Sequence, residues 1–169
     1  MTIDEAIRTA LQYENRVVGV YEEAMTASQD PTGRKVFKTL AEEEKQHVAY
    51  LESKRREWES TGRVTPGPVE SVVPSRAAIA EGIKNLKTKV AVQSRENEIQ
   101  LLKRALQVEV ETSDFYKRMV AELPAEGRDL FERFVQIEEG HKAIVQAELD
   151  SVSGSGFWFD FAEFNLEAG

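Results

Sequence analysis

The chain has no cysteine among its 169 residues. Disulfides, thiol catalysis and thiolate-bound metal clusters are therefore excluded from its chemistry. Proline is scarce, and three of the five prolines fall between residues 60 and 75, which marks this stretch as a linker. No apolar run approaches the length of a membrane-spanning helix, and the N-terminus lacks the basic and apolar regions of a signal peptide. We expect a cytoplasmic protein without a membrane partner.

Positive charge is in the minority, with 22 Lys and Arg against 30 Asp and Glu and a net charge of −8. This balance argues against nucleic acid as a partner. The length suits one domain with its own core. Most of the acidity is spread along predicted helix faces, as is typical of a solvated surface. On this interpretation the following residues lie at the surface: Glu22, Glu23, Glu42, Glu43 and Glu111.

Histidine is also scarce, and the chain has only two. Each lies three residues after a glutamate, in Glu44-Lys45-Gln46-His47 and in Glu138-Glu139-Gly140-His141. Positions i and i+3 share one face of a helix, so each pair can present an oxygen and a nitrogen to the same metal ion. Two such pairs suggest two ions, or one site built from two halves.

The spacing of these residues indicates a duplicated helix pair. His141 lies 94 residues after His47, and Glu138 lies 94 residues after Glu44. An earlier Glu-x6-Tyr pattern also occurs twice, as Glu14 with Tyr21 and as Glu109 with Tyr116. The two copies of that pattern are offset by 95 residues. The order is therefore Glu-x6-Tyr and Glu-x-x-His, a linker, and the same two patterns again.

Apolar periodicity predicts that these polar groups face the interior. In each predicted helix they interrupt a core-facing stripe. Buried carboxylates without a partner are costly, and four of them balance the charge of two divalent ions. The four stripes are Ile7, Ala10, Glu14, Val17 and Tyr21; Phe37, Leu40, Glu44, His47 and Leu51; Leu102, Ala105, Glu109, Thr112 and Tyr116; and Phe131, Phe134, Glu138, His141 and Val145.

The predicted ligands match, in order, the pattern of di-iron carboxylate bundles, in which two helices each supply a Glu and two supply Glu-x-x-His. They are Glu14, Glu44, His47, Glu109, Glu138 and His141. Over roughly residues 3–152 the chain thus resembles the ferritin-like superfamily, and within it the rubrerythrin-type family. The resemblance implies an all-α fold, an antiparallel four-helix bundle with a long crossover between its second and third helices. Without cysteine the chain lacks the rubredoxin module of full-length rubrerythrins, so an external electron donor is expected.

The resemblance implies two iron ions as the cofactor, with manganese or zinc as substitutes that the same ligands accept. Each ion would take one histidine and one terminal carboxylate, from Glu14 or Glu109. Glu44 and Glu138 would bridge the two ions. For Tyr21 and Tyr116 two interpretations stand: each hydroxyl donates a hydrogen bond to a ligand carboxylate, or each ring only packs in the core.

By resemblance, the function would be reduction of hydrogen peroxide or dioxygen, a reaction of oxidative stress, in a homodimer. Rubrerythrins have an additional Glu one turn after the ligand of the third helix, where this chain has Thr112. A six-ligand site is closer to that of bacterioferritin, so oxidation of ferrous iron for iron handling is the alternative. A third hypothesis is a non-catalytic, metal-stabilised bundle that acts in assembly through its aromatic tail.

Long helices are predicted over about residues 2–28, 30–60 and 95–122, and from Pro124 to about residue 151. Thr2 with Glu5 forms a capping box, and Asp30 before Pro31 is a strong helix start. The crossover is residues 60–75, and Ser75 begins a shorter amphipathic stretch with Ile79, Ile83, Leu86 and Val90 before a break near residues 93–94.

The bundle is residues 1–153. The tail, residues 154–169, packs on the bundle or on a partner subunit as a clasp, a lid or a simple chain end; its aromatic residues are Phe157, Trp158, Phe159, Phe161 and Phe164.

Overall fold

The computed structural model describes residues 1–74, 76–84 and 95–161. These residues form five helices and no strand: α1 (Ile3–Ala27), α2 (Pro31–Thr61), α3 (Arg76–Lys84), α4 (Arg95–Glu122) and α5 (Ala125–Gly154). The all-helical prediction is confirmed for this part of the chain. No helix in the described ranges is long and apolar enough to cross a membrane.

Helix boundaries follow the capping signals in the sequence. Thr2 Oγ1 accepts a hydrogen bond from Glu5 N at 3.2 Å, and Glu5 Oε2 accepts one from Thr2 N at 2.8 Å. This is the predicted capping box, and it satisfies two backbone donors at the start of α1. Asp30 caps α2 by accepting from the backbone of Thr32 and Gly33 at 2.8 and 3.1 Å, with Pro31 in the first turn. Both predicted helix starts are confirmed.

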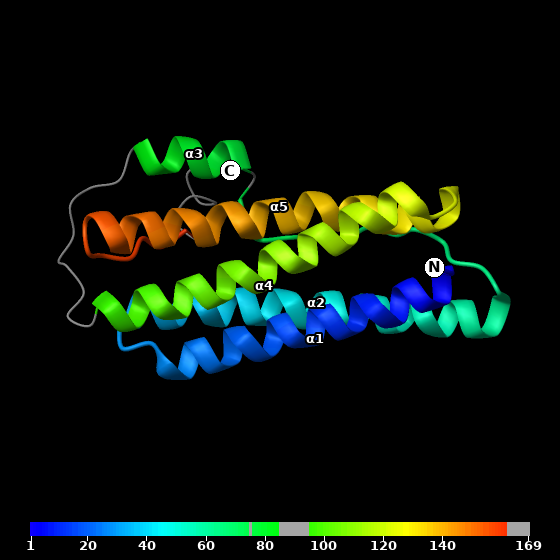
Figure 1. Ribbon diagram of the computed structural model, residues 1–169, viewed down its shortest axis with the longest axis horizontal. Coiled ribbons are helices and arrows are strands. Elements are labelled where there is room, and N and C mark those ends of the chain that lie inside the picture. The colour runs from blue at the N-terminus through cyan, green and yellow to red at the C-terminus, as the bar shows by residue number, and fades with distance from the viewer. Residues whose placement is uncertain (75, 85–94, 162–169) are drawn as a thin grey trace.

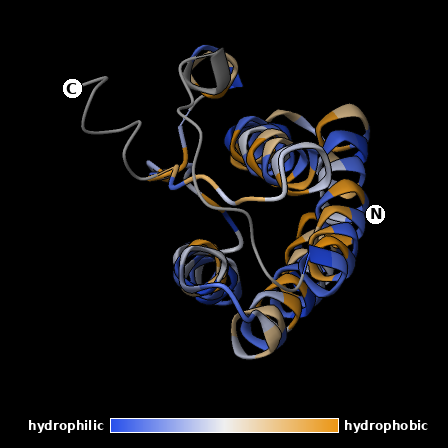
Figure 2. Cartoon of the chain, turned by 90° about the vertical axis from the view of Figure 1, so that its left-hand side faces the viewer, coloured by the Kyte–Doolittle hydropathy of each residue, from blue (hydrophilic) through white to orange (hydrophobic). Residues whose placement is uncertain are grey.

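The long helices pack as a bundle of two hairpins, shown in Figure 1. α1 packs along α2 after a turn of three residues, α4 packs along α5, and α1 and α4 join the two hairpins. Each long helix carries hydrophilic and hydrophobic residues (Figure 2). The segment after α2 runs along the bundle to α3, which packs on α5. This segment, residues 62–74, contains three of the five prolines and crosses from α2 of one hairpin to α5 of the other.

The crossover is attached to the helices through side chains and backbone. Tyr50 of α2 bonds to Gly67 in both directions, since its hydroxyl accepts from the backbone N at 3.0 Å and donates to the carbonyl at 3.2 Å. Arg133 of α5 donates to the carbonyl of Val69 at 3.1 Å. Val69 and Val73 of this segment are themselves buried. These contacts hold the crossover across both hairpins.

The interior contains two hydrophobic clusters with a polar layer between them. Along α1, Ala10 belongs to one cluster, Val17 to the other, and the buried Glu14 lies between. The same sequence of cluster, acid and cluster recurs on α2, α4 and α5. The first cluster is the one that contains Val17, and its large members are Tyr21, Phe37, Leu40, Leu102 and Phe159. The second cluster is the one that contains Ala10, and its large members are Ile7, Leu51, Tyr116, Phe131 and Phe134. Apolar packing therefore seals the polar layer on both sides.

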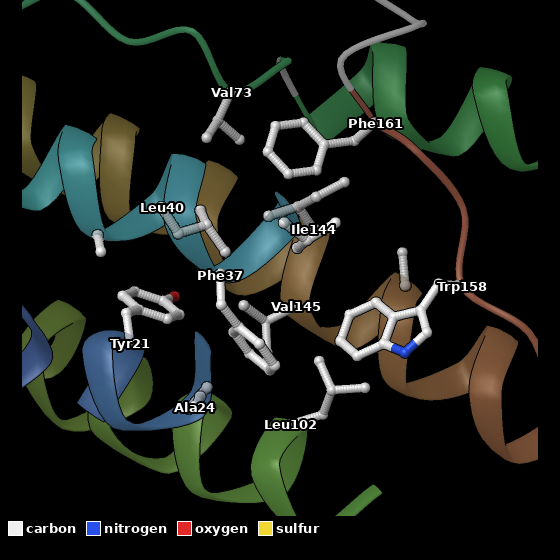
Figure 3. Close-up of a cluster of buried hydrophobic side chains, with 14 of the residues drawn as sticks. Tyr21, Ala24, Phe37, Leu40, Val73, Leu102, Ile144, Val145, Trp158 and Phe161 are labelled. Carbon is white, nitrogen blue, oxygen red and sulfur yellow. The ribbon is translucent and has the colours of Figure 1, made fainter. Parts of the chain in front are cut away.

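The aromatic tail packs on the chain's own helices. Trp158 is 2% exposed and meets Phe37 edge-on, with ring centroids 5.3 Å apart. Figure 3 shows Trp158 and Phe161 pointing into the first cluster. A Cβ at Gly33 would lie only 2.7 Å from the Trp158 ring, so the tail needs glycine there. Phe164 lies outside the described residues, as do Leu86, Val90 and the predicted break near residues 93–94; nothing is described of the Ile83 side chain, whereas Ile79 is buried.

Candidate metal site

The structure brings all six predicted ligands into the polar layer. They come from four helices and are 0–1% exposed. Their nitrogen and oxygen atoms form two groups, each with all atoms within 4.8 Å of one another. One group is Glu14, Glu44, His47 and Glu138, and the other is Glu44, Glu109, Glu138 and His141. The two groups share Glu44 and Glu138, so each could hold one metal ion.

The histidines present the same ring nitrogen to this layer. His47 Nδ1 lies 2.9 Å from Glu44 Oε2, 3.7 Å from Glu138 Oε1 and 3.9 Å from Glu14 Oε2. His141 Nδ1 lies 2.5 Å from Glu44 Oε1, 3.5 Å from Glu109 Oε1 and 3.9 Å from Glu138 Oε2. The two rings stack with centroids 5.6 Å apart. Helical spacing on α2 and α5 thus aims both Nδ1 atoms at a common set of carboxylates.

The two tyrosines cross between the hairpins. Tyr21 of α1 donates a hydrogen bond to Glu109 Oε1 of α4, and Tyr116 of α4 donates to Glu14 Oε1 of α1. Both phenols are fully buried, and burial followed by the nearby carboxylates raises the pKa of each well above 10. Each hydroxyl therefore keeps its proton and fixes one oxygen of its partner. Of the two interpretations of these tyrosines, the structure shows the hydrogen-bonded one.

Burial and mutual proximity shift the acidities in the layer. Burial, with the charge of Glu44, raises the pKa of Glu14 to about 8. Burial and then Glu44 also raise the pKa of Glu138 well above its usual value. For Glu44 burial acts upward, but the two imidazoles outweigh it and lower the pKa well below 4.5. For the imidazoles burial acts downward and the carboxylates outweigh it, so the pKa of His47 rises to about 10 and that of His141 well above 6.5.

These shifts define how the metal-free layer responds to pH. The pKa of His47 rises from 6.5 to about 10 on folding, so its stabilisation is complete below pH 6.5 and is lost as the pH rises through 10. The pKa of Glu14 rises from 4.5 to about 8, so its contribution is likewise lost as the pH rises through 8. At neutral pH, protons on these groups offset the clustered negative charge, and a bound cation would replace them.

The donor set fits divalent cations. Across the described residues, the buried atoms with no hydrogen-bond partner include seven from the six ligands: Glu14 Oε2, Glu44 Oε1, His47 Nε2, Glu109 Oε2, both oxygens of Glu138, and His141 Nδ1. Glu44 Oε1 and His141 Nδ1 are close together but out of hydrogen-bonding geometry. Unpaired buried polar atoms are rare in folded proteins. Four carboxylates and two imidazoles without sulfur suit iron or manganese, and also bind zinc.

Glu43 corrects one sequence prediction, since it was expected at the surface and is 3% exposed. Its Oε1 lies 2.8 Å from His141 Nε2, on the side of the ring opposite Nδ1. It also accepts hydrogen bonds from the hydroxyl of Ser71 and from the backbone N of Val72, the latter at 3.1 Å. The pKa of Glu43 is lowered, because His141 and Ser71 outweigh the upward effect of burial. The crossover covers this face of α2, which helical periodicity does not reveal.

The other four acids predicted at the surface are exposed or half-buried. They form ion pairs with basic residues on the bundle surface: Glu22 with Lys45, Glu23 with Arg104, Glu42 with Lys38, and Glu111 with Arg16. Thr112 is buried, and its hydroxyl donates to the carbonyl of Val108 at 2.7 Å, so it points into its own helix.

Two further buried acids serve structure and were not singled out from the sequence. Glu98 Oε1 accepts from the Ser28 hydroxyl and from the backbone N of Gln29 and Asp30 at 2.9–3.0 Å, which ties α4 to the turn between α1 and α2. Glu148 Oε2 accepts from Phe159 N at 3.2 Å and ties the tail to α5. Both acids continue the core stripes of their helices, which is the signal that marks them.

A pocket of about 320 Å³ lies beside the layer, where the crossover meets α5. Its lining includes Ser71, Arg133, Ile137 and Gly140, and the last two directly precede the ligands Glu138 and His141.

Comparisons of the chain with protein-family profiles, with curated proteins and with solved structures find no match.

Proposed function

We propose that the chain is a non-haem di-iron protein with a ferritin-like, antiparallel four-helix bundle, and that it reduces hydrogen peroxide or dioxygen as rubrerythrins do. The observation that carries the proposal is the pair of ligand groups that share Glu44 and Glu138. Glu44 and Glu138 would each be able to serve both ions, and the full set of six matches the ligands of di-iron carboxylate bundles. Glu14 with His47, and Glu109 with His141, would complete the two ion sites.

Iron would supply two electrons when bound, one from each ferrous ion, which suffices to cleave an O–O bond. The chain's own residues hold and shield the ions. Tyr116 and Tyr21 each occupy one oxygen of Glu14 and Glu109, which leaves Oε2 of each carboxylate available to a cation. The two hydrophobic clusters exclude bulk water above and below the layer. Such fixed, dry donors are the protein's part in metal chemistry.

Electrons would have to reach the site from outside the chain, because it has no cysteine to hold a redox cluster of its own. Hydrogen peroxide and dioxygen are small enough to enter the pocket at the crossover, which borders Gly140 next to His141. We therefore expect a separate electron donor. The homodimer is proposed from the resemblance alone, and because all six ligands come from one chain, each subunit would carry a complete site.

The proposal is tested by anaerobic loading with two equivalents of ferrous iron, followed by rapid mixing with hydrogen peroxide or with dioxygen. We expect fast ferric absorbance with peroxide, slower oxidation with dioxygen, and iron that stays bound. His141→Ala should lose the fast phase, and the exposed Glu42→Ala should keep it. If neither oxidant oxidises the bound iron, the proposed enzyme activity is refuted.

Ferrous oxidation for iron handling is the second candidate, and Thr112 favours it. A seventh carboxylate at that position is the rubrerythrin feature, whereas here a hydroxyl is bonded to the carbonyl of Val108. Faster oxidation by dioxygen with release of ferric iron would support this candidate over peroxide reduction. Sedimentation separates the two further, since a large hollow shell indicates storage and a dimer does not.

A further inference from the structure

The two histidines differ on the side that faces away from the carboxylates. His141 Nε2 lies 2.8 Å from Glu43 Oε1, and Glu43 is held in turn by Ser71 and Val72 of the crossover. His47 Nε2 is buried and has no hydrogen-bond partner within the described residues. Its ring meets Phe134 edge-on at 5.4 Å instead. The Nε2 side of His141 thus contacts a carboxylate, whereas the His47 ring packs against an aromatic ring.

The duplicated sequence explains this difference. Glu43 directly precedes the ligand Glu44, and the residue that precedes Glu138, 94 positions later, is Ile137. Ile137 is buried within the second hydrophobic cluster. The half of the chain that could supply a carboxylate behind His47 therefore supplies an aliphatic side chain. The difference between the two halves is therefore present in the sequence itself.

We propose that Glu43 is a positioning residue that makes the two ion sites inequivalent, so that the ion held by His141 and Glu109 binds more tightly than the one held by His47 and Glu14. This inference rests on the proposed two-ion site. A carboxylate on Nε2–H fixes the tautomer that leaves the Nδ1 lone pair for the ion, and it makes the imidazole a stronger donor. Losing such a partner lowers metal affinity by about 10–100-fold.

The connection also links the crossover to the tighter site. Ser71 and Val72 hold Glu43, and Pro74 O lies 3.6 Å from a Cβ built on Gly140, the residue before His141. The crossover therefore contacts Glu43 on α2 and also lies against α5 beside His141. An ion at the His141 site would bind a ring whose Nε2 side is held by Glu43, whereas at the other site the His47 ring packs against Phe134.

Zinc titration of metal-free protein against a chromophoric chelator tests the inference. Wild type should take up two ions in two resolved steps. Glu43→Leu should weaken the tighter step about 10–100-fold and leave the weaker step unchanged. Glu43→Gln keeps the side-chain size and an acceptor oxygen, so the affinity of its tighter step should lie between those of wild type and Glu43→Leu. This variant also controls for a folding defect in Glu43→Leu. Glu42→Leu, at the exposed neighbouring position, should match wild type.

Imidazole NMR of the zinc-loaded protein supplies a readout that a general loss of packing would not give. With two histidines, long-range ¹H–¹⁵N spectra contain two ring systems, and contacts with Phe134 identify His47. Glu43→Leu should move the Nε2–H signal of His141 alone, whereas Glu42→Leu at the exposed neighbouring position should leave it near its wild-type position.

Five outcomes would count against these assignments, and they separate the inference from the proposed function. Equal affinities in wild type, or equal weakening of both steps in Glu43→Leu, would overturn the inference while the two-ion site stands. Movement of both imidazole signals, or of neither, would overturn it as well. Failure of wild type to bind zinc at all would remove the proposed function and the inference together.

Discussion

Metal removal should destabilise the fold, because the cation offsets buried groups that the chain leaves unpaired. An unsatisfied buried polar atom costs about 1–3 kcal/mol. His47 Nε2 faces away from the carboxylates, so the other six unpaired ligand atoms set an upper range of roughly 6–18 kcal/mol. The stabilisation that an experiment measures depends on the free metal concentration relative to Kd. At free zinc 100-fold above Kd, each site adds about 2.7 kcal/mol, or about 5 kcal/mol for two sites.

For a chain of 169 residues this stabilisation corresponds to a rise in Tm of roughly 10–20 °C. The assay is thermal unfolding by circular dichroism, before and after chelation, with metal removal verified by elemental analysis. His141→Ala removes a ligand of one site only and should keep about half the shift, while Glu42→Ala should keep all of it. An unchanged Tm after verified removal would refute the reasoning that cations offset the buried carboxylates.

Three further predictions follow from the same contacts. Metal-free protein should lose Tm as the pH rises from 4.5 to 10, because the fold keeps the proton of Glu14 up to about pH 8 and that of His47 up to about pH 10, whereas the unfolded chain releases both earlier. Zinc should flatten this profile, and a Tm that rises over this range would contradict the assigned shifts. His141→Ala should bind at most half the metal of wild type by elemental analysis, whereas equal contents in wild type, His141→Ala and Glu42→Ala would refute the ligand assignment. Trp158→Ala should cost about 3–5 kcal/mol in denaturant unfolding, and a cost under about 1 kcal/mol would show that the tail is not part of the core.

Helix periodicity made the all-helical fold and the position of the six candidate ligands accessible from sequence. The spacings Glu-x6-Tyr and Glu-x-x-His each place two groups on one face, and the apolar stripes determine that this face is inward. The cross-hairpin pairing of Tyr21 with Glu109 was less accessible, because it depends on how α1 and α4 approach each other. Metal binding by the six residues stays a prediction.

Glu43 could not be placed from sequence for a physical reason. It lies beside the core stripe of an acid-rich helix, where most such residues are solvated. Its burial comes from Ser71 and Val72, which belong to a segment without helical or strand periodicity, so no pattern predicts which face of α2 it covers. Non-local covering of this kind is set by the packing of the whole crossover.

Anomalous X-ray scattering from crystals of iron-loaded protein, recorded on both sides of the iron edge, tests the central claim most directly. We expect two peaks per chain in the polar layer, both within ligand distance of Glu44 and Glu138. No peak in the layer, or iron only at surface carboxylates such as Glu42, would contradict the proposed centre.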